Sequence, residues 1–132
     1  MERARQVRSS AGLPLGHLRG RLAETVAADY FFAAGFVLLA ANLRAGPLEL
    51  DLVLERGDLL VFVEVRSRRA GAIESALVSV RPKKRVQVRR AAAYAWRRSF
   101  QARTHLQRVR FDVVAVAFEG AGVAIEHIEA AF

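Results

Sequence analysis

Two alternating runs of residues on either side of a short turn constrain the fold of this chain more than any other feature. In residues 48–55 leucine occupies every second position, and the residues between the leucines are mostly acidic. Residues 56–58 read Arg-Gly-Asp, and residues 59–66 form a second run that is rich in Val and Phe. Alternation with a period of two is typical of β-strands, and a glycine-containing turn between two such runs predicts a hairpin. We therefore expect a β-sheet with this hairpin in it.

Helical patterns occur on both sides of the hairpin. In residues 17–34 apolar side chains recur every three or four positions, which predicts a helix. Its apolar stripe consists of Leu18, Leu22, Val26, Tyr30 and Ala33. Pro82 suits the first turn of a helix, and the residues that follow, to about Arg98, have high helix propensity. Residues 68–79 predict a loop, within which residues 73–78 can form a short helical piece.

Three further segments predict strands. Residues 36–41 are a short apolar run typical of a buried strand, and residues 110–118 alternate again. Gly120 and Gly122 mark a turn, after which residues 123–128 can pair back. The order helix, strand, strand, strand, helix, strand, strand predicts an α/β fold, with one mixed β-sheet flanked by helices.

Length and composition indicate one globular domain. The chain has 132 residues, of which 53% are hydrophobic, so we expect a single domain over residues 16–132. Residues 1–15 have no apolar period and predict a flexible basic arm. No apolar stretch is long enough to predict a membrane span. The chain has no cysteine, which excludes disulfides and thiolate metal sites and makes the cytoplasm the default location.

Basic residues are concentrated in one segment. Residues 66–110 contain 14 of the 21 Arg and Lys residues but only one acidic residue, Glu74. Clustered cations of this kind suit a polyanionic partner such as nucleic acid, because they neutralise phosphates and release counterions. A solvated helix face in an arginine-rich protein has the same composition, so composition alone leaves both interpretations open.

Acidic residues gather in the predicted hairpin. Residues two apart in a strand face the same side, so Glu49 lies with Asp51, and Glu64 lies with Arg66. A turn centred on residues 56–57 places Glu49 opposite Glu64, with Asp51 diagonal to it. Carboxylates directly across a strand pair destabilise a sheet unless they reach solvent or share a cation.

Glu64 lies within an apolar run, residues 60–65, that is typical of a central strand buried on both faces. A buried carboxylate is costly unless it is paired or bound to a metal. A salt bridge from Glu64 to Arg66, or to an arginine of the second helix, satisfies this requirement as well as a metal does. Spacing alone therefore does not decide between a structural ion pair and a metal site.

An acid on one strand followed by a Glu-Val-Arg triplet on the next resembles the PD-(D/E)xK nuclease superfamily, whose core is restriction-endonuclease-like. The whole chain looks like the YraN-like family of small bacterial proteins. The stretches that carry the second resemblance cover nearly all of residues 20–132. They are Gly20 with Glu24 and Ala27, Gly35 with Asn42 and Arg44, residues 49–52, residues 61–66, Lys83 or Lys84 before Ala92 and Tyr94, residues 110–112, and His127-Ile128 before Ala131-Phe132.

The resemblance implies a metal-dependent endonuclease that hydrolyses phosphodiester bonds in DNA, including branched or structured DNA. Asp51 and Glu64 would bind Mg²⁺ or Mn²⁺, since these cations prefer hard oxygen ligands. Glu24 would be a third carboxylate, although an exposed acid on an amphipathic helix has the same pattern. Glu49 would join the metal ligands or only shape the site. A homodimer is compatible with the resemblance, but no stretch of the sequence marks a dimer face.

Arg66 departs from the family pattern, which usually has lysine there. Arginine can orient water and stabilise charge, but it effectively never loses its proton. Either Arg66 serves electrostatically, or Lys83 or Lys84 reaches in from the second helix. If neither holds, the chain is a catalytically impaired nucleic-acid-binding or partner-binding module with the same fold. A second departure is Pro47-Leu48, where the family usually puts glycine next to the glutamate.

The remaining charged residues predict supporting roles. Arg68 and Arg69 follow the triplet and are candidate phosphate clamps, with an exposed loop as the alternative. The second helix would hold the phosphate backbone through Lys83, Lys84, Arg90 and Arg97. We expect Asp112 to pair with Arg110 or an arginine of the second helix. We expect His17, His105 and His127 to be surface or structural residues, because their spacing matches no metal site.

Overall fold

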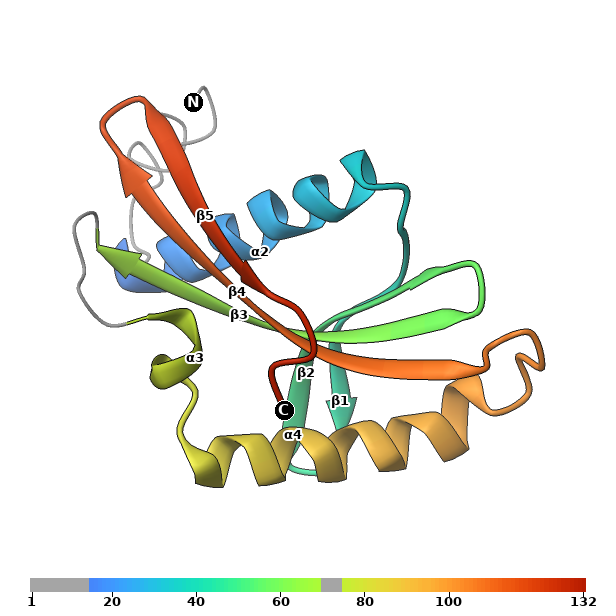
Figure 1. The fold of residues 1–132 in the computed structure, drawn as a ribbon. Coiled ribbons are helices and arrows are strands. Elements are labelled where there is room, and N and C mark those ends of the chain that lie inside the picture. Colours follow the sequence, from blue (N-terminus) through green and yellow to red (C-terminus); the bar gives the residue numbers. More distant parts are fainter. Residues whose placement is uncertain (1–14, 70–74) are drawn as a thin grey trace.

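The computed structural model describes residues 15–69 and 75–132 and places two long helices on opposite faces of a five-stranded sheet (Figure 1). The helices are α2 (Leu15–Ala33), α3 (Ala76–Ser79) and α4 (Pro82–Ala95), and α4 continues into a π-helical turn, η1 (Trp96–Phe100). The strands are β1 (Val37–Ala45), β2 (Leu48–Arg56), β3 (Leu59–Arg69), β4 (Arg108–Glu119) and β5 (Gly122–Ile128). None of the helices in these two ranges is long and apolar enough to cross a membrane.

The sheet is mixed, as the sequence predicts, and its order is β1-β2-β3-β4-β5. All neighbouring strands pair antiparallel except β3 and β4, which are parallel. A parallel pair needs a crossover connection, and the segment with α3 and α4 supplies it. The predicted α/β fold is thus confirmed, and it is compatible with a restriction-endonuclease-like core. Most of the predicted arm, residues 1–14, lies outside the described residues.

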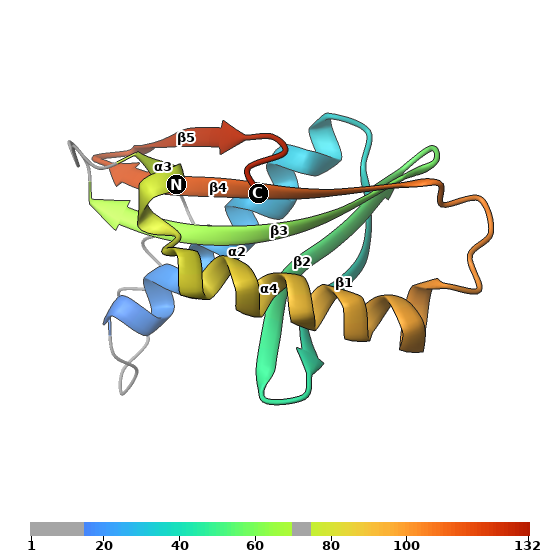
Figure 2. The same ribbon diagram turned by 60° about the horizontal axis from the view of Figure 1, so that its bottom comes forward.

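Two apolar layers hold the helices on the sheet. Figure 2 shows the two long helices, α2 and α4, against the sheet. Phe31 of α2 packs with Val61 and Val63 on one face. On the other face, Val88 of α4 packs with Phe62. Since successive residues of β3 point to opposite faces, both layers are filled from a single central strand. Residues 59–64 are all buried, which confirms the central position that the apolar run predicts for this strand.

The predicted apolar stripe of α2 is correct only in part, since Val26 packs against the core. Among the side chains of α2 that the structure describes, the buried ones are Ala23, Ala27, Ala28 and Phe31. Tyr30 is 37% exposed, and Ala33 is exposed as well. The alanines let the helix backbone approach the sheet closely, whereas the prediction followed the larger apolar side chains.

The strand predicted at residues 36–41 is present, but it is longer and less buried than expected. β1 runs to Ala45, and Val37 at its start is 58% exposed. The reason is topological, because β1 is an edge strand that pairs only with β2.

The register of the β2–β3 hairpin differs from the predicted one. Arg56 pairs with Leu59, so the turn is Gly57-Asp58 and not Arg56-Gly57. Gly57 has a φ of 60°, a conformation that two-residue hairpin turns favour at their first central position. Glu49 is therefore not opposite Glu64, as was predicted. The pairing ends at Leu52 and Val63, and the next residues along this register are Asp51 and Glu64.

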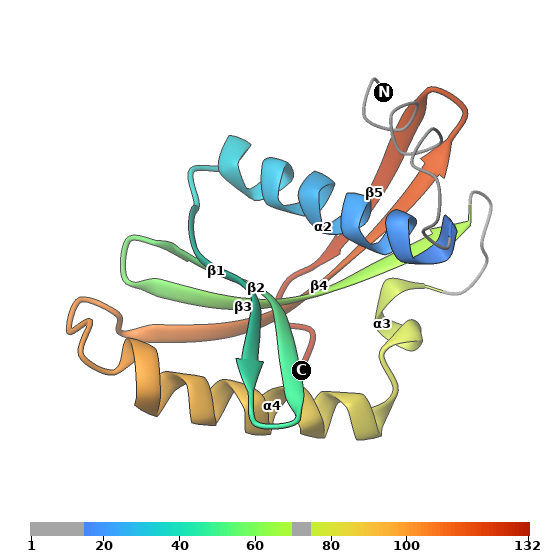
Figure 3. The same ribbon diagram turned by 180° about the vertical axis from the view of Figure 1, so that it is seen from behind.

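Beyond that point the sheet forks. β2 stays paired with β1 as far as Ala45 and Leu48, while β3 stays paired with β4 as far as Arg69 and Phe118. Figure 3 shows the β1–β2 hairpin leaving the rest of the sheet and passing close to α4. Leu50 of this hairpin is buried in the α4 layer. Asp51 and Glu64, the first residues beyond the point where β2 and β3 separate, therefore lie beside the N-terminal half of α4.

Candidate functional site

The fork of the sheet brings two carboxyl groups into contact. Asp51 is the first residue of β2 beyond its pairing with β3. Its Oδ2 accepts a hydrogen bond of 2.8 Å from the main-chain N–H of Val65. The carboxyl groups of Asp51 and Glu64 lie close enough to each other for each to shift the other's pKa. Only 5% of Glu64 is exposed. Two acids predicted to share a site thus lie together, although in direct rather than diagonal contact.

Burial and mutual repulsion make this pair hard to ionise. Burial, with the charge of Asp51 as the next cause, raises the pKa of Glu64 from 4.5 to about 7. Burial also raises the pKa of Asp51, although the N–H of Val65 and the charge of Lys84 oppose the rise. A proton bound between the two carboxyl groups relieves their repulsion, and a cation placed there would relieve it equally well.

Two cationic side chains from different elements reach the same carboxylate oxygen. Glu64 Oε2 lies 3.6 Å from Nη1 of Arg66 on β3 and 3.8 Å from Nζ of Lys84 on α4. Of the two lysines considered from the sequence, Lys84 is the one in contact with this oxygen, while Lys83 is exposed at the start of α4. The ion pair from Glu64 to Arg66 predicted from the sequence is present together with the lysine.

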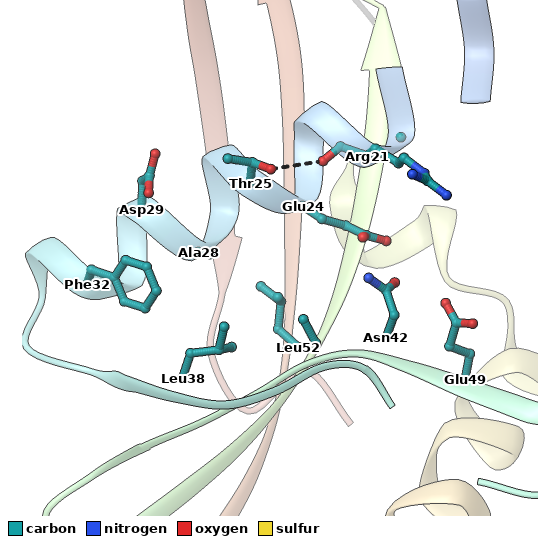
Figure 4. A pocket seen from close by; sticks show the side chains of 12 residues that line it. Arg21, Glu24, Thr25, Ala28, Asp29, Phe32, Leu38, Asn42, Glu49 and Leu52 are labelled. Atoms are coloured by element: carbon teal, nitrogen blue, oxygen red, sulfur yellow. Dashed lines mark hydrogen bonds between the residues drawn. The ribbon is translucent and has the colours of Figure 1, made fainter. Parts of the chain in front are cut away.

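Glu24 of α2 approaches the pair from the other face of the sheet. A groove of about 790 Å³ lies between α2 and the β1–β2 hairpin, and Glu24, Asn42 and Glu49 line one end of it (Figure 4). Burial, with the charge of Asp51 as the next cause, raises the pKa of Glu24, while a hydrogen bond with the Asn42 side chain opposes the rise. Glu24 is therefore close enough to Asp51 to feel its charge.

Glu49 and Asn42 complete that end of the groove. The side chain of Glu49 is 43% exposed and lies 3.9 Å from Arg44 Nη1. Its charge also contributes to the raised pKa of Asp51. Asn42 has a φ of 53°, in the left-handed region that asparagine tolerates better than most residues. Sequence reasoning assigned Asn42 no role, although Asn42 is one of the residues that carry the family resemblance.

The donor chemistry at Asp51 and Glu64 fits a magnesium or manganese ion, because both cations prefer carboxylate oxygens. As the side chains stand, no three acidic or histidine residues within residues 15–69 and 75–132 are grouped to hold a metal ion. Asp51 and Glu64 are the residues that would hold a cation here, and Glu24 and Glu49 lie close enough to interact with Asp51 through their charges.

The basic residues singled out in the sequence fall into two groups. Arg68 belongs to β3, not to a loop, and its Nη1 lies 2.9 Å from Oε1 of Glu126 on β5. The loop prediction for Arg68 and Arg69 is therefore wrong, because β3 extends along β4 to Arg69. Arg69 is exposed at the end of that strand. The predicted stripe of Lys83, Arg90 and Arg97 is exposed along α4 and η1.

A second polar cluster holds the C-terminal segment and was only partly predicted. Asp112 is fully buried and accepts two hydrogen bonds of 2.8 Å from Arg110, which confirms the expected pair. It also accepts from the main-chain N–H of Ala130, and its Oδ2 lies 2.7 Å from Nε2 of His127. The other ring nitrogen of His127 lies 2.9 Å from the hydroxyl of Tyr30. These contacts tie α2, β4 and β5 together, so His127 is a structural residue, as expected.

Comparison with known proteins agrees with the family resemblance. The model of the uncharacterised protein family UPF0102 matches residues 23–116. A UPF0102 protein of Sorangium cellulosum is 39% identical over 127 residues, which cover 93% of this chain and 88% of that protein. A UPF0102 protein of Anaeromyxobacter dehalogenans is 42% identical over 113 residues, with 86% and 82% covered. One of Nitratidesulfovibrio vulgaris is 39% identical over 116 residues, with 88% and 84% covered. The chain belongs to the uncharacterised protein family UPF0102, the YraN family.

Proposed function

We propose that this protein is an endonuclease that hydrolyses phosphodiester bonds in DNA with the help of a divalent cation held by Asp51 and Glu64. The observation that carries the proposal is the carboxyl pair of half-buried Asp51 and buried Glu64 at the fork of the sheet, with Nζ of Lys84 3.8 Å from Glu64 Oε2. Two carboxylates that lie against each other destabilise a fold unless a proton or a cation relieves their repulsion. Ionisable groups held in unfavourable surroundings are enriched at functional sites, so this pair is the first place to look for function.

A magnesium or manganese ion supplies two kinds of chemistry to phosphodiester hydrolysis, since it lowers the pKa of water and neutralises phosphate charge. Asp51 and Glu64 are the residues that would hold it. Asp51 is well placed for this role because the Val65 N–H fixes its orientation through one oxygen, Oδ2. The raised pKa of Glu64 means that a cation binds in competition with a proton at this group.

Lys84 provides the lysine that the Glu-Val-Arg triplet lacks. Its ammonium group reaches the carboxyl pair from α4 and can orient the attacking water or offset charge on the phosphate. Lysine can also lose its proton when its surroundings favour the neutral form, which arginine does not. Nη1 of Arg66 lies 3.6 Å from the same oxygen of Glu64, and Arg66 would act only through its charge. The departure at Arg66 is therefore compatible with catalysis.

DNA is the expected substrate because of the cations that continue from the site along α4. Lys83, Arg90 and Arg97 are exposed at intervals of seven residues, so they form one stripe along the helix. Such a stripe can neutralise successive phosphates of a nucleic acid backbone. Exposed Arg69 lies at the far end of β3. Arg68 contributes less, since it is engaged by Glu126.

The test is cleavage of supercoiled plasmid, linear duplex and four-way branched DNA by the purified chain with Mn²⁺, with Mg²⁺ and with EDTA. We expect cleavage with either metal, none with EDTA, and none from Asp51→Asn or Glu64→Gln. Asp58→Asn is the matched control, because Asp58 lies in the neighbouring β2–β3 turn and pairs with Arg108 far from the site. Equal cleavage by Asp51→Asn and Asp58→Asn preparations would contradict the proposal, since it would point to a contaminating nuclease.

The second candidate is a module of the same fold that binds nucleic acid or a protein but does not cleave. Arg66 in place of lysine is the observation that favours it. Arg66→Lys separates the two: a large gain of cleavage over an inactive wild type would show that arginine had disabled the site. An active wild type that Arg66→Lys leaves unchanged would show that this position works through its charge.

A further inference from the structure

A second pocket opens on the α4 face of the molecule, away from the carboxyl pair. Its volume is about 340 Å³, and apolar side chains make up most of its walls. The residues that matter here are Phe62, Ala92, Trp96 and Phe111, with Arg89 and Arg97 beside them. Trp96 and Phe111 are both half-buried, so each has a surface that a ligand can reach.

The aromatic rings of this region are stacked and carry a guanidinium group. Phe111 stacks on Phe62 with ring centroids 5.6 Å apart and on Phe132 with centroids 5.4 Å apart. The guanidinium carbon of Arg89 lies 5.4 Å from the Phe111 ring centroid and 5.8 Å from that of Phe132. Arg97 lines the pocket from η1 and is exposed. The pocket thus combines aromatic surface with two permanent positive charges.

The pocket lies on the same face of the sheet as Lys84 and Glu64. Phe62 and Glu64 are two residues apart on β3, so their side chains point to the same face. Lys84 and Ala92 are eight residues apart on α4, which places the pocket about 12 Å from Lys84 along the helix axis. That distance corresponds to about three to four base steps of DNA. One strand of nucleic acid can therefore reach both places.

We propose that this pocket binds an unpaired base of the DNA strand whose backbone lies along α4. The base would stack on Trp96, beside the Phe62–Phe111–Phe132 stack, and its flanking phosphates would contact Arg89 and Arg97. Aromatic side chains beside a cationic track are the usual means of holding single-stranded nucleic acid, because every base has a flat π-face. The inference rests on the proposed function for the nucleic acid and adds that the substrate has unpaired bases near the site.

Trp96 is the chain's only tryptophan, so its fluorescence reports directly on this pocket. The experiment is a titration with a short oligo(dT) in EDTA, where cleavage cannot occur. We expect saturable quenching with oligo(dT), and little quenching with an abasic strand of equal length or with a blunt duplex. Because the titration is made in EDTA, the quenching does not depend on cleavage, so a failure of the nuclease proposal and a failure of this one are separable.

Variants at two neighbouring aromatics test the pocket without relying on fluorescence. Trp96→Leu should weaken binding of labelled oligo(dT), measured by anisotropy, about 5-fold or more, the effect of losing one base–aromatic stack. Tyr94→Leu is the matched control, since Tyr94 is 39% exposed on the same helix, carries Arg98 over its ring and does not line the pocket. Circular dichroism would confirm that both variants are folded.

Three results would overturn the inference. Equal quenching by the abasic strand would show that only the backbone is bound, and equal quenching by the duplex would show that no unpaired base is needed. Equal affinities of Trp96→Leu and Tyr94→Leu would remove the pocket from DNA binding. If Trp96→Leu then altered self-association in sedimentation, the pocket would instead be a protein contact.

Discussion

Nζ of Lys84 on α4 lies 3.8 Å from Oε2 of Glu64 on β3, and Nη1 of Arg66 lies 3.6 Å from the same oxygen. The nuclease resemblance leads one to expect a lysine on the strand, and α4, which is part of the crossover between β3 and β4, places Lys84 beside the same carboxylate. Glu64 is almost fully buried, so both cations act on a charge that water screens poorly. The Glu-Val-Arg triplet contains no lysine, but this contact places a lysine from α4 next to its glutamate.

Lys84→Met should reduce cleavage about 100- to 1,000-fold, the range found when one group that stabilises transition-state charge is removed. The reason is the loss of the ammonium group beside the carboxyl pair, with the methylene stem retained. The measurement is the single-turnover cleavage rate of plasmid or branched DNA with Mn²⁺.

Lys83→Met is the matched control for Lys84→Met. Lys83 is the adjacent residue of the same helix, has the same charge and is exposed. Its substitution should weaken DNA binding modestly and leave the single-turnover rate at saturating enzyme nearly unchanged. Equal losses in the two variants would show that Lys84 contributes only to the general positive charge of α4.

Stability should fall as pH rises through the neutral range, and Glu64 should be a main cause. The folded-state pKa of Glu64 is raised by burial and by the charge of Asp51, to about 7 from 4.5. A raised pKa means that the stabilising contribution is full below pH 4.5 and is lost as pH increases through about 7. The loss between pH 5 and pH 8 should reach up to about 3 kcal/mol. The measurement is urea unfolding in EDTA at both values.

Glu64→Gln should lack most of that pH dependence, because the amide mimics the protonated acid at every pH. Asp51 and Glu24 also have raised pKa values, so the difference between wild type and variant is the quantity to compare. Asp58→Asn should keep the wild-type slope over this range. A wild type and a Glu64→Gln variant with parallel slopes would contradict the assignment of the raised pKa to Glu64.

Asp112→Asn should destabilise the fold by about 3–5 kcal/mol, the usual cost of removing one partner of a buried ion pair. The asparagine would leave Arg110 and His127 without the carboxylate that both contact. Burial tends to raise the pKa of Asp112, but hydrogen bonds from His127, Arg110 and the Ala130 N–H outweigh it and lower the pKa. Its stabilising contribution is therefore present above pH 3.8 and is lost as pH falls through the lowered folded-state pKa.

The measurement for Asp112→Asn is the free energy of unfolding in urea at neutral pH and again in acid. The difference from wild type should shrink as the acid range is entered. Asp58→Asn again serves as control, since Asp58 also pairs with an arginine on β4 but in solvent. That exposed pair should have little effect on stability. Similar losses in both variants would contradict the structural role given to the Asp112 cluster.

The elements and the central strand could be predicted from the sequence because each depends on local pattern. The alternation around residues 48–66 and the helical character of α4 come from neighbouring residues alone. The register could not be predicted in this way. Either Arg56-Gly57 or Gly57-Asp58 can make the turn, and the choice moves every residue of β2 relative to β3 by two positions. The strand pattern therefore could not show that Asp51 rather than Glu49 lies directly across from Glu64, although the family resemblance already joined Asp51 with Glu64.

The members of the site that sequence reasoning could not place are those that come from distant elements. The sequence allowed either Lys83 or Lys84 to reach the carboxyl pair. Only the position of α4 beside the fork shows that Lys84 is the one in contact. Asn42 depends on a left-handed backbone in an edge strand. The contact between Tyr30 and His127 joins residues 97 positions apart and has no local signal. Long-range geometry decides these cases, whereas periodicity decides the elements.

The most direct measurement of the central claim is anomalous diffraction from crystals grown with Mn²⁺ near pH 8, where the proton on Glu64 is mostly lost. We expect a manganese peak that contacts oxygens of both Asp51 and Glu64, at about 2.0–2.2 Å, close to the Mg²⁺ distance. The peak should be absent in Asp51→Asn crystals grown in the same way. A wild-type crystal with no manganese between these two carboxylates, and the same cleavage activity in Asp51→Asn as in wild type, would contradict the claim.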